Sequence, residues 1–312
     1  MNICRFFQNS LLFVLQLAFI LLAILTILFF LQRLSGDPAA TLAGHTASPE
    51  VLEGLREEMG LNEPIYVQYG IFVRDALMLD FGHSVRYQKP ALDMVLARFP
   101  NTLLLSFSAL SLAILIGVPL GIYAALFHKR ADGMAVNTFA GVLQAIPNFW
   151  LGLVLLLIFS VQLGWVGSIS NLEDDPVKRL ALPAITLSAF YIARLIRLVR
   201  GSLIEEMSEP YMTTARAKGL SSPRVLFGHA FKNTLIPVLA FITIDLSLLI
   251  GGSVIVETLF SYSGVGEQMV TAIFNRDYAV VQATVFVIAV TVVLLNSFSN
   301  FLYRLIDPRI TA

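Results

Sequence analysis

Only a few residues of this 312-residue chain could do chemistry, and one of them lies inside an apolar segment. Asp245 is the only charged residue between Lys232 and Glu257. A carboxylate at the centre of a membrane helix costs about 2.5–3.5 kcal/mol on insertion scales, so it usually faces a cavity or a partner group. Asp245 is therefore a candidate pore residue that would contact an amino group or a cation. The alternative is that a neighbouring helix satisfies the carboxylate, or that it is protonated in place.

Side chains that bind metals or phosphates do not have the spacing that either role needs. The histidines are scattered (His45, His83, His128 and His229), and the single cysteine, Cys4, excludes an internal disulfide framework and a zinc cluster. The chain has no Gly-x-x-x-x-Gly-Lys-Ser/Thr motif, so it lacks the backbone loop that holds nucleotide phosphates. We expect no catalytic residue, no metal site and no bound cofactor in this chain.

A second group of candidates lies in the polar segment 201–231. Residues 202–218 are compatible with a helix, Gly219 is a typical helix end, and Ser222-Pro223 can start another helix. A solvated basic loop would explain the charges here but not the small side chains, which suit a knob that fits a groove on another protein. The candidate contact residues are Tyr211, Thr213, Thr214, Ala215, Arg216, Ala217, Lys218 and Gly219.

The composition restricts which kind of protein could position these residues. The chain is 57% apolar and 13% charged, with equal numbers of basic and acidic residues, whereas a soluble chain has about 25% charged residues. A soluble enzyme, a disordered protein and a nucleic-acid binder are therefore excluded. The chain is expected to be a membrane protein.

Six charge-poor windows are long enough to span a bilayer, which takes about 20 apolar residues. They cover approximately residues 10–31, 101–127, 134–163, 182–200, 234–256 and 279–302. We expect an all-α polytopic protein with one transmembrane domain over residues 1–312. The first window is longer than the apolar region of a signal peptide and no Ala-x-Ala site closely follows it, so it is expected to be a retained anchor.

The distribution of lysine and arginine predicts the orientation. Both termini and the segment 201–231 fall on the more basic side, which places them in the cytoplasm. Arg194, Arg197 and Arg200 are expected to anchor the end of the fourth span at the interface. Residues 33–100 form an external cap with helices near 49–59 and 65–79, the second of them closed by Gly82. The cap is either a tethered loop or a docking platform for an external partner.

Two local patterns bear on how the spans pack. Gly117 and Gly121 form a Gly-x-x-x-Gly pattern, which permits close helix packing and would also suit a partner interface. Pro119 and Pro147 can kink their spans.

Residues 211–220 resemble the cytoplasmic ATPase-contact signature of the permease subunits of bacterial ABC importers, and Thr-Ala-Arg-Ala-Lys-Gly-Leu is characteristic of the dipeptide/oligopeptide/nickel branch. The resemblance covers nearly the whole chain. The matching segments follow one another in the order typical of the B-type permease, the first of the two permease types of this branch. Pro210, Ser263 and Asp245 depart from the pattern. The other matching segments are residues 36–38, 61–64, 68–69, 80–84, 98–102, 251–253, 256–260, 275–278 and 307–310.

The resemblance implies the type I ABC importer permease fold and an importer that works by alternating access in the bacterial cytoplasmic (inner) membrane. The expected partners are a second homologous permease, two cytoplasmic ABC ATPase subunits, an external solute-binding protein and membrane lipid, with no nucleic acid. ATP and magnesium would bind to the ATPases, which residues 211–219 would contact. The implied cargo is a peptide, with nickel chelates or glutathione as alternatives on the same architecture.

Two rival classes remain. An ion-coupled secondary transporter would need several intramembrane ionisable groups or unwound helices in related halves, whereas this chain has one such residue and no evident repeat. A non-transporting membrane scaffold would not explain the large segment between the fourth and fifth spans. ATP-dependent uptake with an ATPase partner would separate these classes.

Overall fold

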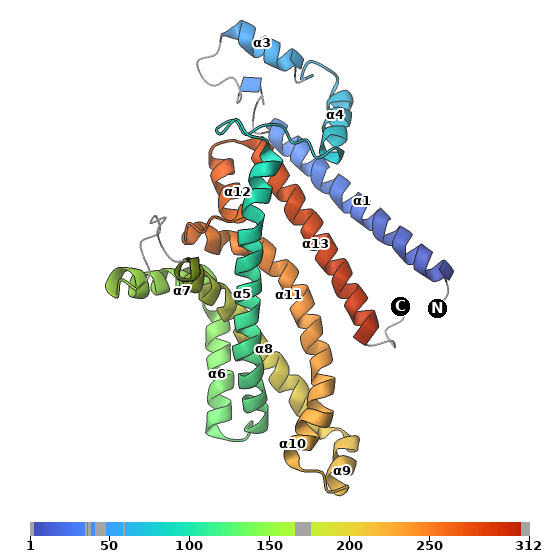
Figure 1. The fold of residues 1–312 in the computed structure, drawn as a ribbon, viewed down its shortest axis with the longest axis vertical. Coiled ribbons are helices and arrows are strands. Elements are labelled where there is room, and N and C mark those ends of the chain that lie inside the picture. Colours follow the sequence, from blue (N-terminus) through green and yellow to red (C-terminus); the bar gives the residue numbers. More distant parts are fainter. Residues whose placement is uncertain are drawn as a thin grey trace. The chain divides into compact units, whose positions relative to one another are not determined.

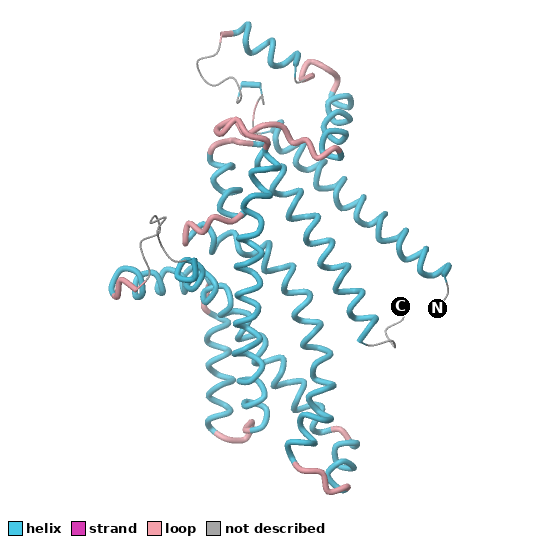
Figure 2. Tube along the Cα trace, in the orientation of Figure 1, coloured by secondary structure: helices cyan, strands magenta, loops and turns pink. Residues whose placement is uncertain are grey.

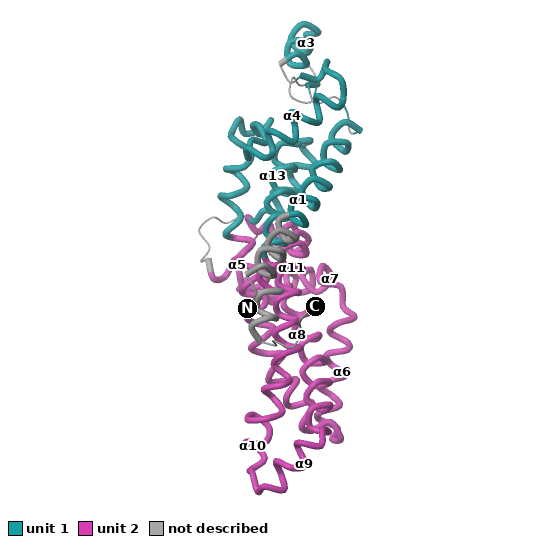
Figure 3. The backbone as a smooth tube through the Cα atoms, turned by 90° about the vertical axis from the view of Figure 1, so that its right-hand side faces the viewer, with its two compact units in different colours: residues 1–100, 264–294 teal, residues 101–263, 295–312 magenta. Residues whose placement is uncertain are grey.

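The computed structural model describes residues 3–34, 36, 39–40, 48–58, 60–165 and 176–306 (Figure 1). These residues form helices joined by loops, and beyond one isolated bridge between His83 and Pro90 they form no β-structure (Figure 2). The chain divides into two compact units, residues 1–100 with 264–294 and residues 101–263 with 295–312 (Figure 3). The prediction of an all-α protein is confirmed.

The first unit is held together by apolar helix faces and by a buried hydrogen bond. A buried cluster that includes Leu25, Phe81 and Phe286 forms its core. Ser84 donates a hydrogen bond to the carboxylate of Asp277, and both side chains are buried. Segments 80–84 and 275–278, which both carry the family resemblance, are therefore in contact. The helices of this unit are α1 (Ile3–Leu34), α3 (Pro49–Glu58), α4 (Ile65–Leu77), α12 (Val265–Phe274), the first turns of α5 (Ala91–Leu126) and most of α13 (Tyr278–Ile306).

The second helix of the expected cap is shorter in the structure. Helix α4 ends at Leu77 and not at Leu79, because the chain turns at Leu79, which adopts a positive φ of 62°. Ile65 and Leu77, at the two ends of α4, are 55% and 70% exposed. In the middle of the helix, Tyr69 and Phe72 contact the ring of Phe29 on α1.

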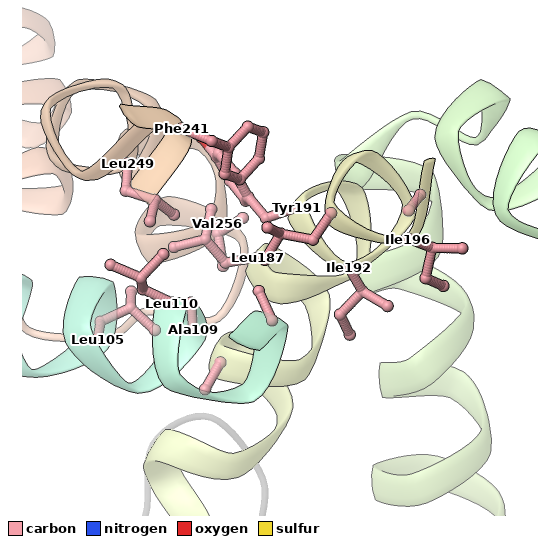
Figure 4. Packing of buried hydrophobic residues seen from close by; sticks show 14 of the residues in the cluster. Leu105, Ala109, Leu110, Leu187, Tyr191, Ile192, Ile196, Phe241, Leu249 and Val256 are labelled. Carbon is pink, nitrogen blue, oxygen red and sulfur yellow. The ribbon is translucent and has the colours of Figure 1, made fainter. Parts of the chain in front are cut away.

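The second unit is organised around α8 (Pro176–Ser208). Apolar side chains of α5 and α11 (Phe231–Leu259) pack against Leu187, Tyr191 and Ile192 of α8 (Figure 4). In the apolar window of α8, 72% of the residues are buried, against 11–44% in the other candidate spans. Helix α8 is therefore the central helix of this unit. The remaining elements are α6 (Ala131–Ala145), α7 (Asn148–Leu155), the π-helical η1 (Leu156–Gln162), α9 (Pro210–Ala217), α10 (Ser222–Val225), the π-helical η2 (Leu226–Ala230) and the end of α13.

Five described helices are long and apolar enough to cross a membrane, and one bent pair would make a sixth span. The expected span 134–163 is sharply bent near Pro147, where a kink was expected: α6 and the segment Asn148–Gln162 meet at an angle of 97°. Ile146 is extended (φ −77°, ψ 124°) and Pro147 precedes α7. Proline disfavours the helical conformation of the residue before it and cannot continue the backbone hydrogen bonding, which breaks the span here.

The Gly-x-x-x-Gly pattern packs within the chain. A Cβ atom built on Gly117 would lie 2.8 Å from Cβ of Leu195, and one on Gly121 would lie 2.7 Å from Cβ of Val199 and 3.0 Å from the carbonyl oxygen of Ile196. These glycines therefore allow α5 to approach α8 closely. The structure favours this intrachain role over the partner interface.

A Gly121→Val substitution is expected to destabilise the second unit by about 1–3 kcal/mol, because the backbone of α8 would have to move to make room for the side chain. Thermal unfolding of the purified protein in detergent measures the loss as a lower midpoint. The matched control is Gly141→Val on α6, where a Cβ atom meets nothing within 4 Å. Equal midpoints for the two variants would contradict the close approach.

Candidate functional site

The polar segment between α8 and α11 folds into a small helical knob, defined here as residues 209–230. The expected helix over residues 202–218 is interrupted, because α8 ends at Ser208 and α9 begins at Pro210. Glu209 between them is extended (φ −67°, ψ 146°). Pro210 explains the break, because it restricts Glu209 to extended backbone and then fits the first turn of α9.

The bend of the knob lies where the sequence predicts it. Helix α9 ends at Ala217, and Gly219 follows with a φ of +76°. Glycine adopts this left-handed conformation at no steric cost, whereas a β-branched side chain is strained there. Ser221 then precedes α10 with Pro223 in its first turn. The predicted helix end and restart are both confirmed.

A separate apolar core holds the knob on the rest of the second unit. Met212 and Ala215 of α9 pack with Val225 and Leu226, together with Leu203 of α8. Ala215 is 8% exposed, so it lies inside the knob and not on its contact surface, contrary to expectation. Phe227, in contrast, is 55% exposed. The other predicted contact residues are exposed: Tyr211, Thr213, Thr214, Arg216, Ala217, Lys218 and Gly219.

Tyr211 connects three helices at the base of the knob. Its hydroxyl donates to the carboxylate of Glu206 on α8 and accepts from the side-chain amide of Asn233 on α11 at 2.8 Å. The same amide donates to Glu206 at 3.1 Å. Partial desolvation, followed by the hydrogen bond to Glu206, raises the pKa of the Tyr211 hydroxyl above its usual value. The hydroxyl therefore stays protonated, and a hydrogen-bond donor, at neutral and mildly alkaline pH.

If the knob contacts an ATPase, as the family resemblance implies, a Tyr211→Phe substitution is expected to weaken the coupling of transport to ATP hydrolysis roughly two- to tenfold, which corresponds to the net contribution of about 0.5–1.5 kcal/mol of one hydrogen bond. The ratio of cargo transported to ATP hydrolysed measures this coupling. For the unmodified protein, the ratio of cargo transported to ATP hydrolysed is expected to be unchanged between about pH 6 and about pH 9, because the raised pKa of Tyr211 keeps its hydroxyl neutral in this range. An unchanged ratio in the variant would show that the contact with Glu206 does not hold the knob.

Asp245 lies at the middle of α11 and forms an ion pair with Arg194 of α8. Nη1 of Arg194 donates to Oδ1 of Asp245 at 2.7 Å. The Asp245 side chain is 1% exposed and that of Arg194 is 35% exposed. This agrees with the alternative in which a neighbouring helix satisfies the carboxylate, and it leaves Arg194 as the accessible member of the pair.

The sequence did not reveal the partners of these arginines. Arg194 and Arg197 lie within α8, which continues to Ser208. Arg197 donates to the side-chain oxygen of Gln144 on α6 at 2.9 Å. The spacing of the arginines places them on one face but does not reveal their partners, which lie 51 and 53 residues away.

In the part of the chain that the structure describes, no group of three or more His, Cys, Asp or Glu side chains could hold a metal ion. His45 and residues 307–310 lie outside the described residues.

Comparisons with known proteins cover nearly the whole chain. The family model for the N-terminal part of binding-protein-dependent transport system membrane components matches residues 4–106. The model for binding-protein-dependent transport system inner membrane components matches residues 117–312. The first match ends and the second begins within α5, with residues 107–116 between them.

Relatives of similar length are permease proteins of transport systems. A probable peptide ABC transporter permease protein, y4tP, from Sinorhizobium fredii is 40% identical over 91% of this chain and 92% of its own. The oligopeptide transport system permease protein AppB from Bacillus subtilis is 38% identical over 93% of this chain and 95% of its own. The glutathione transport system permease protein GsiC from Escherichia coli is 35% identical over 91% and 92%.

The fold also resembles that of a solved ABC transporter. A chain of the MetNI methionine ABC transporter in an inward-facing conformation matches with a TM-score of 0.59 and 15% identity, over 69% of this chain and 96% of that chain. At this identity the match concerns the fold alone. Taken with the two family models and the close relatives, it shows that the chain is a multi-pass permease of the binding-protein-dependent transport system inner membrane component family of ABC importers.

Proposed function

We propose that this chain is the membrane-spanning subunit of an ATP-driven importer for peptides of the dipeptide or oligopeptide class. The names of its relatives at 38–40% identity support this cargo. Glutathione is the second candidate, because a glutathione permease is 35% identical over almost the same length. Glutathione is itself a small peptide with free carboxylates, so both candidates share the chemistry that the permease would handle.

The knob is the observation that carries the proposal, since it presents exposed basic and small side chains on a compact support. We infer that it faces the cytoplasm and occupies a groove on one of two ATPase subunits, which bind ATP and magnesium. A second permease of similar fold and an external solute-binding protein would complete the importer. The cap, residues 33–100, would face outwards towards that binding protein.

The contacts of the knob suit a rigid lever. Its apolar core includes Leu203 of α8, and Tyr211 is hydrogen-bonded to both α8 and α11. A displacement of the knob would therefore move two packed spans together and not a loose loop. Closure of the ATPases around ATP would rotate these spans and change which side of the membrane the pathway opens to.

The test is uptake of radiolabelled di- and oligopeptides by proteoliposomes that contain the whole importer. Uptake is expected to require ATP and the solute-binding protein, and to persist when ionophores collapse all ion gradients. Replacing the phosphate-binding lysine of the ATPase subunits by alanine should stop it. Uptake that follows an ion gradient and continues with the disabled ATPases would overturn the proposal in favour of a secondary transporter.

A further inference from the structure

The central helix of the second unit exposes two arginines on one face. Between Leu187 and Val199 every residue of α8 is buried except Phe190, Arg194, Arg197 and Leu198. Phe190, Arg194 and Arg197 follow the i, i+4, i+7 spacing of one helix face. Gln144 of α6 extends this face through its hydrogen bond to Arg197.

This face carries more positive than negative charge. Arg194, Arg197 and Arg200 are the only basic residues of α8 beyond Arg179, and Asp245 is the only acid in α11 before Glu257. The packed parts of α5, α6 and α7 add no charge: residues 101–126, 133–145 and 148–155 contain no charged residue. The middle of the unit therefore contains three cations and one anion.

Contact of this face with lipid would be unfavourable. Each arginine at the centre of a membrane helix costs about 2.5–3.5 kcal/mol on insertion scales, and such residues normally face a cavity or a bundle interior. Two arginines one turn apart on the most buried helix of the unit are therefore expected to face polar groups or water and not lipid tails. Where such a face lines the path of a solute, its net positive charge favours negatively charged solutes.

We propose that Arg194 and Arg197 bind a carboxylate group of the solute while it crosses the membrane, and that Asp245 positions Arg194 for this contact. The inference rests on the proposed function and deepens it, since it assigns the chemical group of the cargo that the permease itself recognises. For a short peptide this group is the C-terminal carboxylate.

The geometry of Arg194 leaves donors available for such a ligand. A guanidinium group has five N–H donors, and Asp245 receives a single hydrogen bond, from Nη1. The guanidinium carbon lies 4.8 Å from the ring centre of Phe241 and 5.6 Å from that of Phe190. The ion pair and the two rings hold the orientation of the planar group, while 35% of the side chain stays open. A planar, preorganised guanidinium can bind a carboxylate through two parallel hydrogen bonds.

Labelling of the arginines tests binding directly in the assembled importer. Phenylglyoxal modification is followed residue by residue with peptide mass spectrometry, with a millimolar dipeptide or its C-terminal amide present. We expect the free acid, but not the amide, to slow modification of Arg194 and Arg197. Arg130, whose side chain is 65% exposed and paired with Asp132, is the internal control and should react equally in both cases. An Arg194 that is inert in the complex without peptide, or equal protection by acid and amide, would overturn the proposal.

Uptake provides the second measurement, with each peptide at a concentration that saturates the isolated binding protein. The unmodified importer should transport the acid about ten- to a hundredfold faster than the amide, the factor expected for a charged hydrogen bond. The double variant Arg194→Gln/Asp245→Asn removes both charges of the pair and should reduce this preference, because only Arg197 remains to bind the carboxylate. A preference of undiminished size in the double variant would contradict binding of the carboxylate by Arg194.

The outcomes separate this inference from the proposed function. In one outcome, the unmodified importer takes up peptide acids and amides equally well, with no protection of Arg194 from labelling. That result would disprove the carboxylate site but would still support the peptide importer. An importer that transports no peptide of either kind removes the proposed function itself. If the double variant does not assemble, the labelling result on the unmodified complex decides the question.

Discussion

A Gly219→Val variant is expected to lose ATP-driven uptake to less than about a tenth of the normal rate while it still inserts into the membrane. Gly219 has a φ of +76°, and a left-handed conformation costs an ordinary residue roughly 1–2 kcal/mol, with β-branched side chains among the worst fits. A Cβ atom at this position meets nothing within 4 Å in this chain, so the substitution leaves the core of the knob intact. The changed bend would misdirect the surface that we propose contacts the ATPase.

Uptake and ATP hydrolysis by the reconstituted importer measure this effect together. Hydrolysis should continue but should no longer be stimulated by the loaded binding protein. Gly219→Asn is the matched variant, because asparagine tolerates a positive φ. Activity of the asparagine variant would show that the backbone bend matters, whereas its inactivity would show that the partner approaches too closely for any side chain. Normal uptake by both variants would contradict the role of the knob.

Breaking the ion pair of the second unit is expected to have the largest effect on stability. Arg194→Gln leaves the carboxylate of Asp245 without its partner at 1% exposure, which should cost about 3–5 kcal/mol, the range for removing one member of a buried pair. Asp245→Asn should cost less, because the Arg194 side chain is 35% exposed and can reach water. The double variant should recover most of the stability, since it leaves no unpaired charge.

Chemical or thermal unfolding of the four proteins in one detergent completes this double-mutant cycle. The coupling energy between the two positions is expected to exceed about 1 kcal/mol, as for residues in direct contact. Strictly additive losses would mean that the two side chains do not interact in the membrane-embedded protein. In that case Asp245 would have no positioning role, and Arg194 would need another explanation.

The sequence predicted those features that depend on short stretches of chain. The apolar windows identify the spans, because a bilayer accepts only long segments whose backbone groups are satisfied internally. Gly219 and Pro223 mark the end and the restart of the helices in the knob, because their backbone preferences act within one or two residues. The same rules applied to Pro147 allowed a kink, but the size of the bend there, 97°, depends on the helices packed around it.

Only the tertiary structure determined which side chains meet. The burial of Ala215, the close approach at Gly121 and the ion pair of Arg194 with Asp245 each join segments far apart in the chain. A helix period tells which residues share a face, but not which face receives a neighbour or which neighbour it is. The packing energy that decides this is the sum of many small contacts, and no single residue supplies most of it.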